Sequence, residues 1–496
     1  MITITAGAVW ASLSGPIEAI RCVQQELTIE DPAARFKSSF KYGHWDRFIR
    51  MYDQARGRFL SGLVSRIADV LRTAGHQVKI NAVDTPFRQP FVPALSGVQF
   101  RPYQEQAVKA ALDARRIALQ SPTGSGKTEI GMDILRRAGL RALWVVHRDV
   151  LRDQTIKRMK DRMPGVAIGS IGDGTFEVGD ITVAIVNSLQ PMLRNERFWQ
   201  QFEAIVFDEA HRASADMFYK VSLACTKATL RIALSGTLLG KDKIRNMKLE
   251  GMTGPPMVVA ETMELVEMKF LANPRIVFLH VPAETYPRYS TVREKVCPTW
   301  RDNPRQLMKL GAKLHETAYS IGIAKNEVRN STIVRTASWY AAKRGEKVLV
   351  LTSLRAHGKT VYGSIVRSLD DNPGLRSIFR AYIDGTTSDT ERDDVLTQFR
   401  SAPTGAVLVA TPFMREGVDI PEIDVAILAG GGASETAVMQ AVGRALRPRP
   451  DKQEVLIFDF WDGIGIDDKD YLANHRAERL RAYQDRKFLI QKQRAT

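Results

Sequence analysis

A glycine-rich loop that ends in a lysine and a threonine contains the residue types most directly suited to chemistry. Its residues are Ser121, Pro122, Thr123, Gly124, Ser125, Gly126, Lys127 and Thr128. The glycines let backbone N–H groups turn inward around phosphate oxygens, and the helix expected to follow adds its dipole. In such loops the lysine reaches the β- and γ-phosphates and the threonine ligates Mg²⁺. The pattern usually starts with Gly or Ala, so Ser121 departs mildly from it. The loop as a whole predicts a site for a nucleoside triphosphate.

Two adjacent carboxylates, Asp208 and Glu209, follow the apolar run Ala204–Phe207. The carboxyl end of a strand is where an open α/β sheet presents its chemistry. At that place Asp208 is suited to hold Mg²⁺, and Glu209 to orient or deprotonate the attacking water. Alone, the pair is equally well explained as an acidic loop after a strand. Its position 81 residues after Lys127 favours the catalytic interpretation.

A third segment supplies positive charge. Arg444 and Arg447 are three residues apart, which places them on one face of a helix, and Gln440 precedes them. They lie more than 300 residues from Lys127, so they serve the same phosphates only if a second domain closes onto the nucleotide. Arginines placed in this way stabilise γ-phosphate charge as arginine fingers. The alternative is a basic, solvated helix face without a catalytic part.

The elements that must position these residues are expected to be buried parallel strands that alternate with helices. Short β-branched runs without polar alternation are typical of such strands, and the helical patterns between them indicate βαβ units. The runs are Ala142–Val146, Val183–Val186, Ala204–Phe207, Ile232–Ser235, Val348–Thr352, Ala406–Thr411, Val425–Ala429 and Val455–Phe458. The predicted fold class is therefore α/β, with two domains of this kind in tandem.

Proline clusters predict where the domains begin and end. Pro86, Pro90 and Pro93 close a small N-terminal segment, and a second group of prolines between residues 282 and 304 interrupts the strand–helix pattern. The predicted division is a small α+β domain over 1–95, a first α/β domain over 96–282, a linker or insertion over 283–312, a second α/β domain over 313–465 and a basic C-terminal helix over 466–496.

Composition narrows the class of protein. The 496 residues include 71 Lys and Arg against 55 Asp and Glu, a net charge of +16 that points to a polyanion, nucleic acid first. A merely basic protein is the alternative. Cys22, Cys225 and Cys297 form no CxxC pair, which argues against a zinc ribbon or a disulfide scaffold and fits a reducing cytoplasm. Neither a signal peptide nor a membrane span is expected, so no membrane partner is predicted.

The order of the motifs resembles that of superfamily 2 helicases of the DEAH type, over about residues 98–460. The resemblance implies two RecA-like domains that share an ATP and Mg²⁺ at their interface. It also implies further nucleotide contacts, from Arg101, Tyr103, Gln104, Gly417 and Asp419. Gln104 would then face the edge of the adenine. Ser235-Gly236-Thr237 resembles the motif that couples ATP to strand movement, where alanine is commoner than Gly236.

The same resemblance implies contacts to the backbone of a nucleic-acid strand, made by hydroxyls, amides and helix N-termini. The residues that match such positions are Arg148, Gly172, Ser188, Thr352 and Thr411. Each of them alone is equally well explained as an ordinary loop or strand-end residue. Contacts to the backbone imply little sequence preference and a strong dependence on salt.

A basic and aromatic segment lies within residues 35–59. Its cations, Arg47 and Arg50 among them, suit phosphates, and its aromatic rings suit exposed bases. The alternative is that the rings form the core of a small domain and the basic residues its solvated face. Residues 42–50 resemble the N-terminal domain of UvsW-type phage helicases. This implies branched-DNA remodelling (branch migration, fork regression, unwinding of R-loops, D-loops and RNA–DNA hybrids), a phage source inside a host cytoplasm, and phage or host recombination proteins as partners.

The C-terminal tail, from Tyr471 onward, mixes apolar and basic residues and is predicted to be one amphipathic helix that packs on the second α/β domain or touches duplex. Three rival functions remain. An RNA-preferring superfamily 2 helicase uses similar motifs. A restriction-type duplex translocase ranks lower, because no nuclease or methyltransferase segment accompanies the motor. An ATP-gated clamp would not need both Glu209 and the arginine pair.

Overall fold

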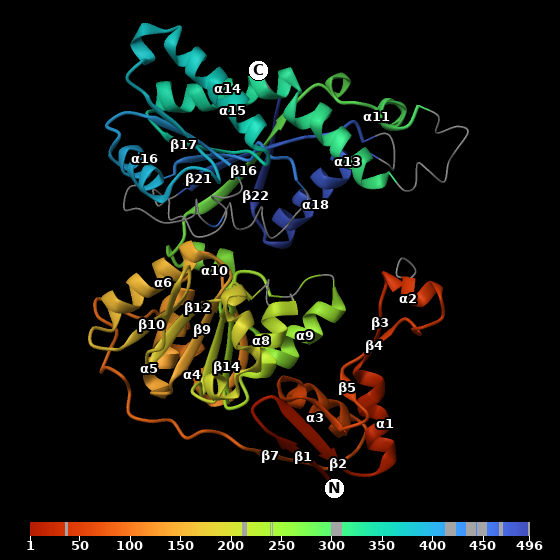
Figure 1. The fold of residues 1–496 in the computed structure, drawn as a ribbon. Helices are drawn as coiled ribbons and strands as arrows, with labels where there is room; N and C mark the ends of the chain where they lie inside the picture. The colour runs from red at the N-terminus through yellow and green to blue at the C-terminus, as the bar shows by residue number, and fades with distance from the viewer. Residues whose placement is uncertain are drawn as a thin grey trace. The chain divides into compact units, whose positions relative to one another are not determined.

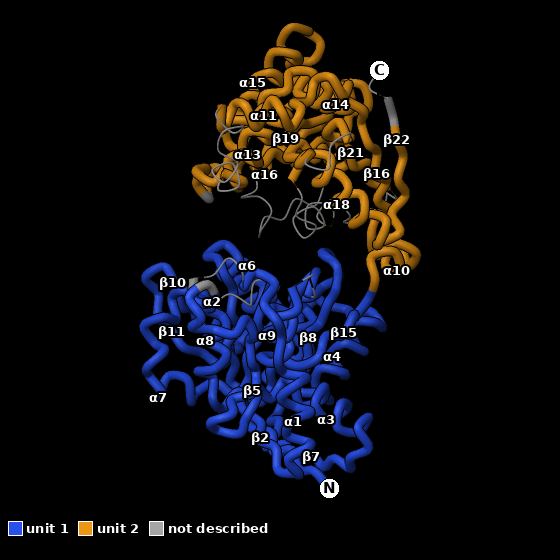
Figure 2. Tube along the Cα trace, turned by 90° about the vertical axis from the view of Figure 1, so that its right-hand side faces the viewer, with its two compact units in different colours: residues 1–260 blue, residues 261–496 orange. Residues whose placement is uncertain are grey.

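The computed structural model describes residues 1–34, 38–210, 216–238, 240, 242–298, 310–411, 423–432, 443, 454–465 and 470–494. The chain divides into two compact units, residues 1–260 and 261–496 (Figure 2). Five predicted site residues lie outside the described residues: Gln440, Arg444, Arg447, Gly417 and Asp419.

The first unit begins with a small α+β part on a five-stranded sheet of order β5-β6-β2-β1-β7. Its elements are β1 (Ile2–Ala6), β2 (Trp10–Ser14), α1 (Ile17–Glu26), β5 (Tyr52–Asp53), β6 (Arg58–Leu60), α3 (Val64–Thr73) and β7 (Val78–Ala82). β1 pairs antiparallel with β2 and parallel with β7. Ile4, Phe59 and Leu63 are fully buried in its core.

The basic and aromatic segment divides between this core and the surface. β3 (Thr28–Glu30) pairs antiparallel with β4 (Phe48–Arg50), and α2 (Ser38–Lys41) lies between them in sequence. Tyr52 is buried in the core, as the structural alternative predicted, whereas Tyr42 is 76% exposed. The aromatic residues therefore do not share one role.

The α+β part is packed tightly on helix α9 (Lys243–Thr253) of the neighbouring α/β sheet. Arg66 on α3 donates to both carboxylate oxygens of the buried Glu250, at 2.7 to 3.2 Å. A Cβ added to Gly62 would lie 2.0 Å from the carbonyl oxygen of Glu250 and 2.6 Å from that of Gly251. Met247 of α9 joins the core of the α+β part. The two parts therefore meet backbone to backbone, with no room for a side chain at position 62.

Gly62→Ala is expected to push α3 and α9 apart and to lower the free energy of unfolding of the first unit by about 1–3 kcal/mol, because overpacked contacts strain both partners. Thermal unfolding followed by circular dichroism measures the effect. Gly240→Ala is the matched control, since a Cβ there meets nothing within 4 Å. Equal unfolding curves for the two variants would contradict the tight contact.

The rest of the first unit is an eight-stranded sheet of order β11-β10-β12-β9-β13-β14-β8-β15, parallel except for β11. The strands are β8 (Arg116–Gln120), β9 (Ala142–Val146), β10 (Ile168–Gly172), β11 (Thr175–Glu177), β12 (Ile181–Ile185), β13 (Ala204–Asp208), β14 (Leu230–Ser235) and β15 (Pro256–Val258). The helices are α4 (Pro102–Ala114), α5 (Lys127–Ala138), α6 (Asp149–Arg162), α7 (Glu196–Trp199), α8 (Asp216–Ala224) and α9. Every residue of β9 and β13 is buried, as parallel strands covered on both faces require.

An extended segment, residues 83–101, connects the α+β part to this sheet and is fastened along it by arginines. Arg88 forms a bidentate pair with Glu203 at 2.6 Å. Arg136 donates to the carbonyl oxygens of Val92 and Pro93. Arg162 donates to those of residues 96 and 97. The proline-containing segment is therefore an extended connection bound along the surface of the domain. Several basic side chains have a structural role here.

The second unit is built on a seven-stranded sheet of order β18-β19-β17-β20-β21-β16-β22, whose neighbouring strands are all parallel. The strands are β16 (Asn273–His280), β17 (Lys347–Leu351), β18 (Phe379–Ile383), β19 (Ala406–Ala410), β20 (Val425–Ile427), β21 (Glu454–Phe460) and β22 (Leu489–Arg494). The helices are α10 (Thr262–Glu267), α11 (Tyr289–Val296), α13 (Gly311–Tyr319), α14 (Glu327–Arg344), α15 (Arg355–Asp370), α16 (Asp389–Ser401) and α18 (Tyr471–Asp485). α14 and α15 pack side by side (Figure 1).

Two segments lie elsewhere than the sequence pattern predicted. β16 falls within 96–282, yet it pairs with β21 and β22, so residues 261–282 belong to the second unit. The tail is helical only in part: α18 ends at Asp485, Lys487 has a left-handed φ of 58°, and β22 then joins the sheet. Within the predicted linker, α11 packs against α13 through Val292 and Leu314.

In the part of the chain that the structure describes, none of the helices is both long enough and apolar enough to cross a membrane.

Candidate ATP site

The phosphate-binding loop lies between β8 and α5, at the carboxyl edge of the first unit's parallel sheet. Gly124 and Gly126 have φ angles of +86° and +84°, which L side chains rarely adopt, so the loop requires glycine at both positions. Ser121 donates from its hydroxyl to the hydroxyl of Ser125 at 2.6 Å, and both are fully buried. The serine that replaces the usual first residue therefore links the start of the loop to its fifth residue.

Lys127 is held inside this loop. Its Nζ donates to the carbonyl oxygens of Ser121 and Pro122, both at 3.1 Å. Burial lowers the pKa of its ammonium group, while the charges of Glu209 and Asp208 oppose that shift. Among the described residues, this ammonium group has two carbonyl partners and lies near two carboxylates, so a third hydrogen bond is left for a phosphate oxygen. Pro122, Thr123 and Thr128 are half-buried around it.

The two predicted carboxylates lie at the end of β13. Burial, and then the charge of Glu209, raise the pKa of Asp208 to about 6. The carboxylate of Asp208 accepts from the backbone N–H of Glu209 at 2.9 Å, and Glu209 has a left-handed φ of 50°. Such backbone strain in a non-glycine residue is frequent at functional sites. A divalent cation would favour the ionised form of this buried carboxylate, so the chemistry of Asp208 suits a Mg²⁺ ligand, and the part of Thr128 stays a prediction.

Strand register brings three of the predicted motifs to one edge. Asp208 pairs in register with Leu234, and Ser235 with Gln120, whose next residue starts the phosphate loop. The backbone N–H of Ser121 donates to the carbonyl oxygen of Ser235 at 3.0 Å. A Cβ added to Gly236 would lie 3.9 Å from the Nζ of Lys127, so the Ser235–Thr237 segment borders the lysine directly.

Gln120 is a residue of this edge that the sequence analysis missed. Its Oε1 accepts from the backbone N–H of Leu238 at 3.1 Å, which fastens the segment after Ser235 to the strand before the phosphate loop. A glutamine at the end of an apolar strand gives no distinctive sequence signal, because its role depends on which strand lies beside it.

The residues predicted to read the adenine lie at the start of α4, where two of them contact the phosphate loop. Tyr103 donates from its hydroxyl, and Gln104 from its Nε2, to the carbonyl oxygen of Ser125 at 2.8 and 2.7 Å. The Oε1 of Gln104 accepts from the backbone N–H of Arg101 at 2.9 Å. In this structure the amide of Gln104 therefore links the loop, through Nε2, to the first turn of α4, through Oε1, and its contact with a base stays a prediction.

The candidate nucleic-acid residues of the first unit lie at element ends. Arg148 is the residue before α6, and Ser188 lies in the 3₁₀ segment Val186–Arg194. Gly172, at the end of β10, has a φ of +138°, and a Cβ there would lie 2.6 Å from a methyl carbon of Ile185. Local packing by itself therefore requires glycine at position 172.

Thr352 and Thr411 of the second unit follow the adjacent strands β17 and β19, and both are buried. The backbone N–H of Thr352 donates to the carbonyl oxygen of Ala410 at 2.9 Å. The two residues thus share one sheet edge. Their side chains are buried in this structure, and their contact with nucleic acid stays a prediction.

Arg50 ends β4, Arg47 directly precedes that strand, and both arginines are ion-paired. Arg50 binds both oxygens of Asp46, and Arg47 lies 3.5 Å from the carboxylate of Glu30. The pairing lowers the pKa of Asp46 to about 2 through its hydrogen bond to Arg50. Each arginine keeps an exposed side chain, but part of its charge is already compensated.

Known proteins match both α/β halves. The family described as type III restriction enzyme, res subunit, matches residues 97–239, and the helicase conserved C-terminal domain matches residues 330–449. The ATP-dependent DNA helicase uvsW of Enterobacteria phage T4 is 26% identical, covering 93% of each chain. The DNA 3'-5' translocase XPB2 of Sulfurisphaera tokodaii is 26% identical, covering 77% of this chain and 85% of the relative.

A solved structure shares the fold. The fragment structure of a putative HsdR subunit of a type I restriction enzyme from Vibrio vulnificus YJ016 aligns with a TM-score of 0.56 and 18% identity, covering 79% of this chain and 68% of that one. Three findings agree on the family: the family matches in both halves, the two domains built on parallel sheets, and the order of the motifs. The chain belongs to the superfamily 2 helicases and is an ATP-dependent helicase enzyme with two tandem RecA-like domains.

Proposed function

We propose that this helicase acts on DNA and remodels branched DNA, by branch migration, fork regression or unwinding of R-loops and D-loops. The proposed ATP-driven motor activity is supported by one observation. The phosphate loop, Asp208 and the Ser235–Thr237 segment lie together at one edge of the first unit's sheet. The DNA part is supported by the phage T4 helicase and the archaeal DNA translocase, which match most of this chain.

In this proposal each residue of the edge has one task. Lys127 and the backbone N–H groups of the loop bind the β- and γ-phosphates of ATP, and Thr128 and Asp208 hold Mg²⁺. The cation, when bound, neutralises phosphate charge and polarises the γ-phosphoryl group. Glu209 orients the attacking water and accepts its proton. Arg101, Tyr103 and Gln104 keep the loop in place and adjoin the base.

The second RecA-like domain contributes positive charge. Gln440, Arg444 and Arg447 act on the γ-phosphate during hydrolysis, and Gly417 and Asp419 link the nucleotide to the nucleic acid. Arg148, Gly172, Ser188, Thr352 and Thr411 mark where the two domains hold the strand backbone. Alternating grip by the two domains, driven by ATP binding and phosphate release, then moves the strand.

The proposal is tested by measuring which nucleic-acid polymer stimulates ATP hydrolysis. We expect single-stranded or branched DNA to raise the turnover number strongly, with RNA alone a poor activator. Stimulation by RNA only would overturn the DNA assignment in favour of an RNA helicase. Stimulation by duplex without strand separation would indicate the translocase, and no stimulation by any polymer would indicate a clamp.

Replacing both Arg47 and Arg50 with alanine is expected to weaken binding of branched DNA roughly tenfold, about 1.4 kcal/mol. It should also reduce the slope of log affinity against log salt by up to about 2, because each phosphate contact releases counterions. Fluorescence anisotropy across a salt series measures both quantities. Arg72→Ala is the matched control, an exposed arginine of the same α+β part paired with Asp69. An unchanged slope would remove these arginines from the DNA surface.

A further inference from the structure

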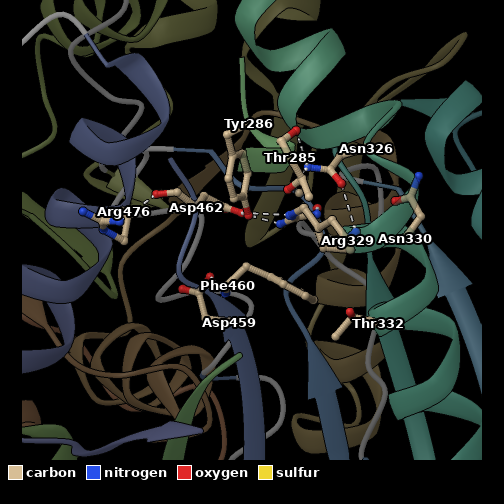
Figure 3. A network of polar contacts seen from close by, with 12 residues as sticks. Thr285, Tyr286, Asn326, Arg329, Asn330, Thr332, Asp459, Phe460, Asp462 and Arg476 are labelled. Atoms are coloured by element: carbon tan, nitrogen blue, oxygen red, sulfur yellow. Dashed lines mark hydrogen bonds and ion pairs between the residues drawn. The ribbon is translucent and has the colours of Figure 1, made fainter. Parts of the chain in front are cut away.

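Arginines of the second unit are held by aspartates in two different settings. Arg329 on α14 donates from Nε to Asp462 at 2.8 Å (Figure 3), and from Nη1 to the carbonyl oxygen of Ala429 at 2.7 Å. The side chains of Arg329 and Asp462 are fully buried, so this guanidinium group belongs to the core. Arg355, the first residue of α15, is also paired with an aspartate, but its own side chain is 53% exposed.

Two acceptors that follow β18 fix the guanidinium group of Arg355. Its Nε donates to the carboxylate of Asp384 and its Nη2 to the hydroxyl of Thr386, both at 2.9 Å. Among the residues that the structure describes, Nη1 of Arg355 has no hydrogen-bond partner. The group is therefore held in one orientation with donors left over. Holding it in this way lowers the entropic cost of binding an anion.

The aspartate that holds Arg355 has other donors of its own. Asp384 is buried and accepts from the backbone N–H and the hydroxyl of Thr386, at 2.8 and 2.6 Å, and from the hydroxyl of Tyr382 at 3.0 Å. Burial opposes its charge, yet these hydrogen bonds and that of Arg355 keep the pKa of its carboxyl well below the usual value. Replacing Arg355 therefore leaves the buried carboxylate with three donors.

Backbone hydrogen bonds bring Arg355 to the same sheet edge as the two candidate strand contacts of this unit. The strands β18, β19 and β17 are neighbours in the sheet. The N–H of Thr411 donates to the last carbonyl oxygen of β18 at 3.3 Å, and the N–H of Thr352 to that of β19 at 2.9 Å. Asp384 directly follows β18, and Arg355 lies three residues after Thr352. The ion pair therefore lies at the carboxyl edge of the sheet.

Exposure separates the side chains of this edge. Thr352, Thr411 and Asp384 are buried, whereas Arg355 is exposed. Lys359 is also exposed, and because it lies four residues further along α15 it shares a helix face with Arg355. An anionic chain that follows this edge would therefore reach the two cations more readily than the two threonine hydroxyls.

We propose that Arg355, held by Asp384 and Thr386, is a phosphate contact that binds the backbone of a DNA strand at the carboxyl edge of the second unit's sheet. A fixed guanidinium group with a free end suits phosphate oxygens, and a contact to the backbone carries no base preference. Lys359 adds positive charge beside it. The proposal rests on the proposed DNA function, and it names an exposed side chain for an edge whose candidate threonines are buried.

Arg355→Ala is expected to weaken binding of a labelled oligothymidylate about fivefold, and to reduce the slope of log affinity against log salt by about 0.7, the value for one phosphate of a single strand. Fluorescence anisotropy across a salt series, without nucleotide, measures both quantities. The matched control is Arg367→Ala, an exposed arginine in the last turn of the same helix that donates to Ser364 at 3.1 Å. We expect the control to bind as wild type does. Wild-type affinity and slope in Arg355→Ala would overturn the proposal.

Arg355→Lys separates the charge of the side chain from its orientation. Lysine keeps the positive charge, so the salt slope should return to the wild-type value. The affinity should stay about twofold to threefold lower, because an ammonium group cannot bond Asp384 and Thr386 as the planar fork does. A slope as low as that of Arg355→Ala would show that the loss does not come from the charge, and would contradict the phosphate contact.

The same measurements show which part of the account fails. If the wild-type chain showed no salt-dependent binding of DNA, the proposed function and this contact would both fail. If the wild-type chain bound DNA and Arg355→Ala bound it equally well, only the contact would fail. Affinity for a fluorescent ATP analogue, measured without DNA, identifies the phosphate that is bound. A loss there in place of DNA affinity would assign Arg355 to the nucleotide and overturn the strand contact.

Discussion

Replacing Glu209 with glutamine is expected to slow ATP hydrolysis by about 10²–10⁴-fold while ATP and DNA still bind. The amide has nearly the shape of the carboxylate but cannot accept the proton of the attacking water. Glu209 occupies a strained turn at the end of β13, next to Asp208 and within the electrostatic reach of Lys127. The change leaves the proposed phosphate and Mg²⁺ ligands in place, so the effect should appear in turnover and not in affinity.

Single-turnover hydrolysis and fluorescent-nucleotide binding, measured on the same preparation, separate the two quantities. Glu177→Gln on β11 is the matched control, because it makes the same chemical change on an exposed strand of the same sheet. Near wild-type turnover in Glu209→Gln would exclude the general-base role. Loss of nucleotide affinity in place of turnover would instead assign the residue to binding.

Arg447→Ala is expected to reduce the turnover number by about 10³–10⁵-fold, the range associated with an arginine finger, with nucleotide affinity changed only a few-fold. The reason is that the guanidinium group is needed most when charge develops on the γ-phosphoryl oxygens in the transition state. The prediction comes from the sequence motif, because Arg447 itself lies outside the described residues.

Arg449→Ala provides the control for Arg447→Ala, since it removes an equal charge two residues away. Steady-state kinetics at saturating DNA should show a normal turnover number for Arg449→Ala. If Arg447→Ala raised the KM for ATP and left turnover unchanged, the residue would serve ground-state binding and the finger assignment would be wrong.

Buried parallel strands made most of the fold predictable from sequence. The run Ala142–Val146 is β9 residue for residue, and Ala204–Phe207 is β13 short of Asp208. Both strands are covered on two faces, so their sequences are continuously apolar and easily recognised. Placing Asp208 at a strand's carboxyl end followed from that strand, and register then brought it to the phosphate loop.

Long-range pairing and the use of individual charges were not predictable. β16 and β22 come from opposite ends of the second unit, and residues 273–280 are assigned to that sheet only by the long-range pairing of β16 with β21 and β22. Arg479 belonged to a tail predicted to be a basic helix, yet it is buried between two aspartates. Arg231 is equally buried and donates to the carbonyl oxygens of four residues, 222, 225, 228 and 252. The net charge of +16 therefore overstates the surface left for nucleic acid.

To test ATP-driven remodelling of branched DNA, four substrates are offered side by side with ATP and with a non-hydrolysable analogue. They are a four-way junction, a stalled-fork mimic, a tailed linear duplex and an RNA–DNA hybrid, resolved by native gel electrophoresis. We expect the junction and the fork to be processed fastest, only with hydrolysable ATP, and not by Glu209→Gln. Activity confined to RNA duplexes, or equal activity without hydrolysis, would contradict it.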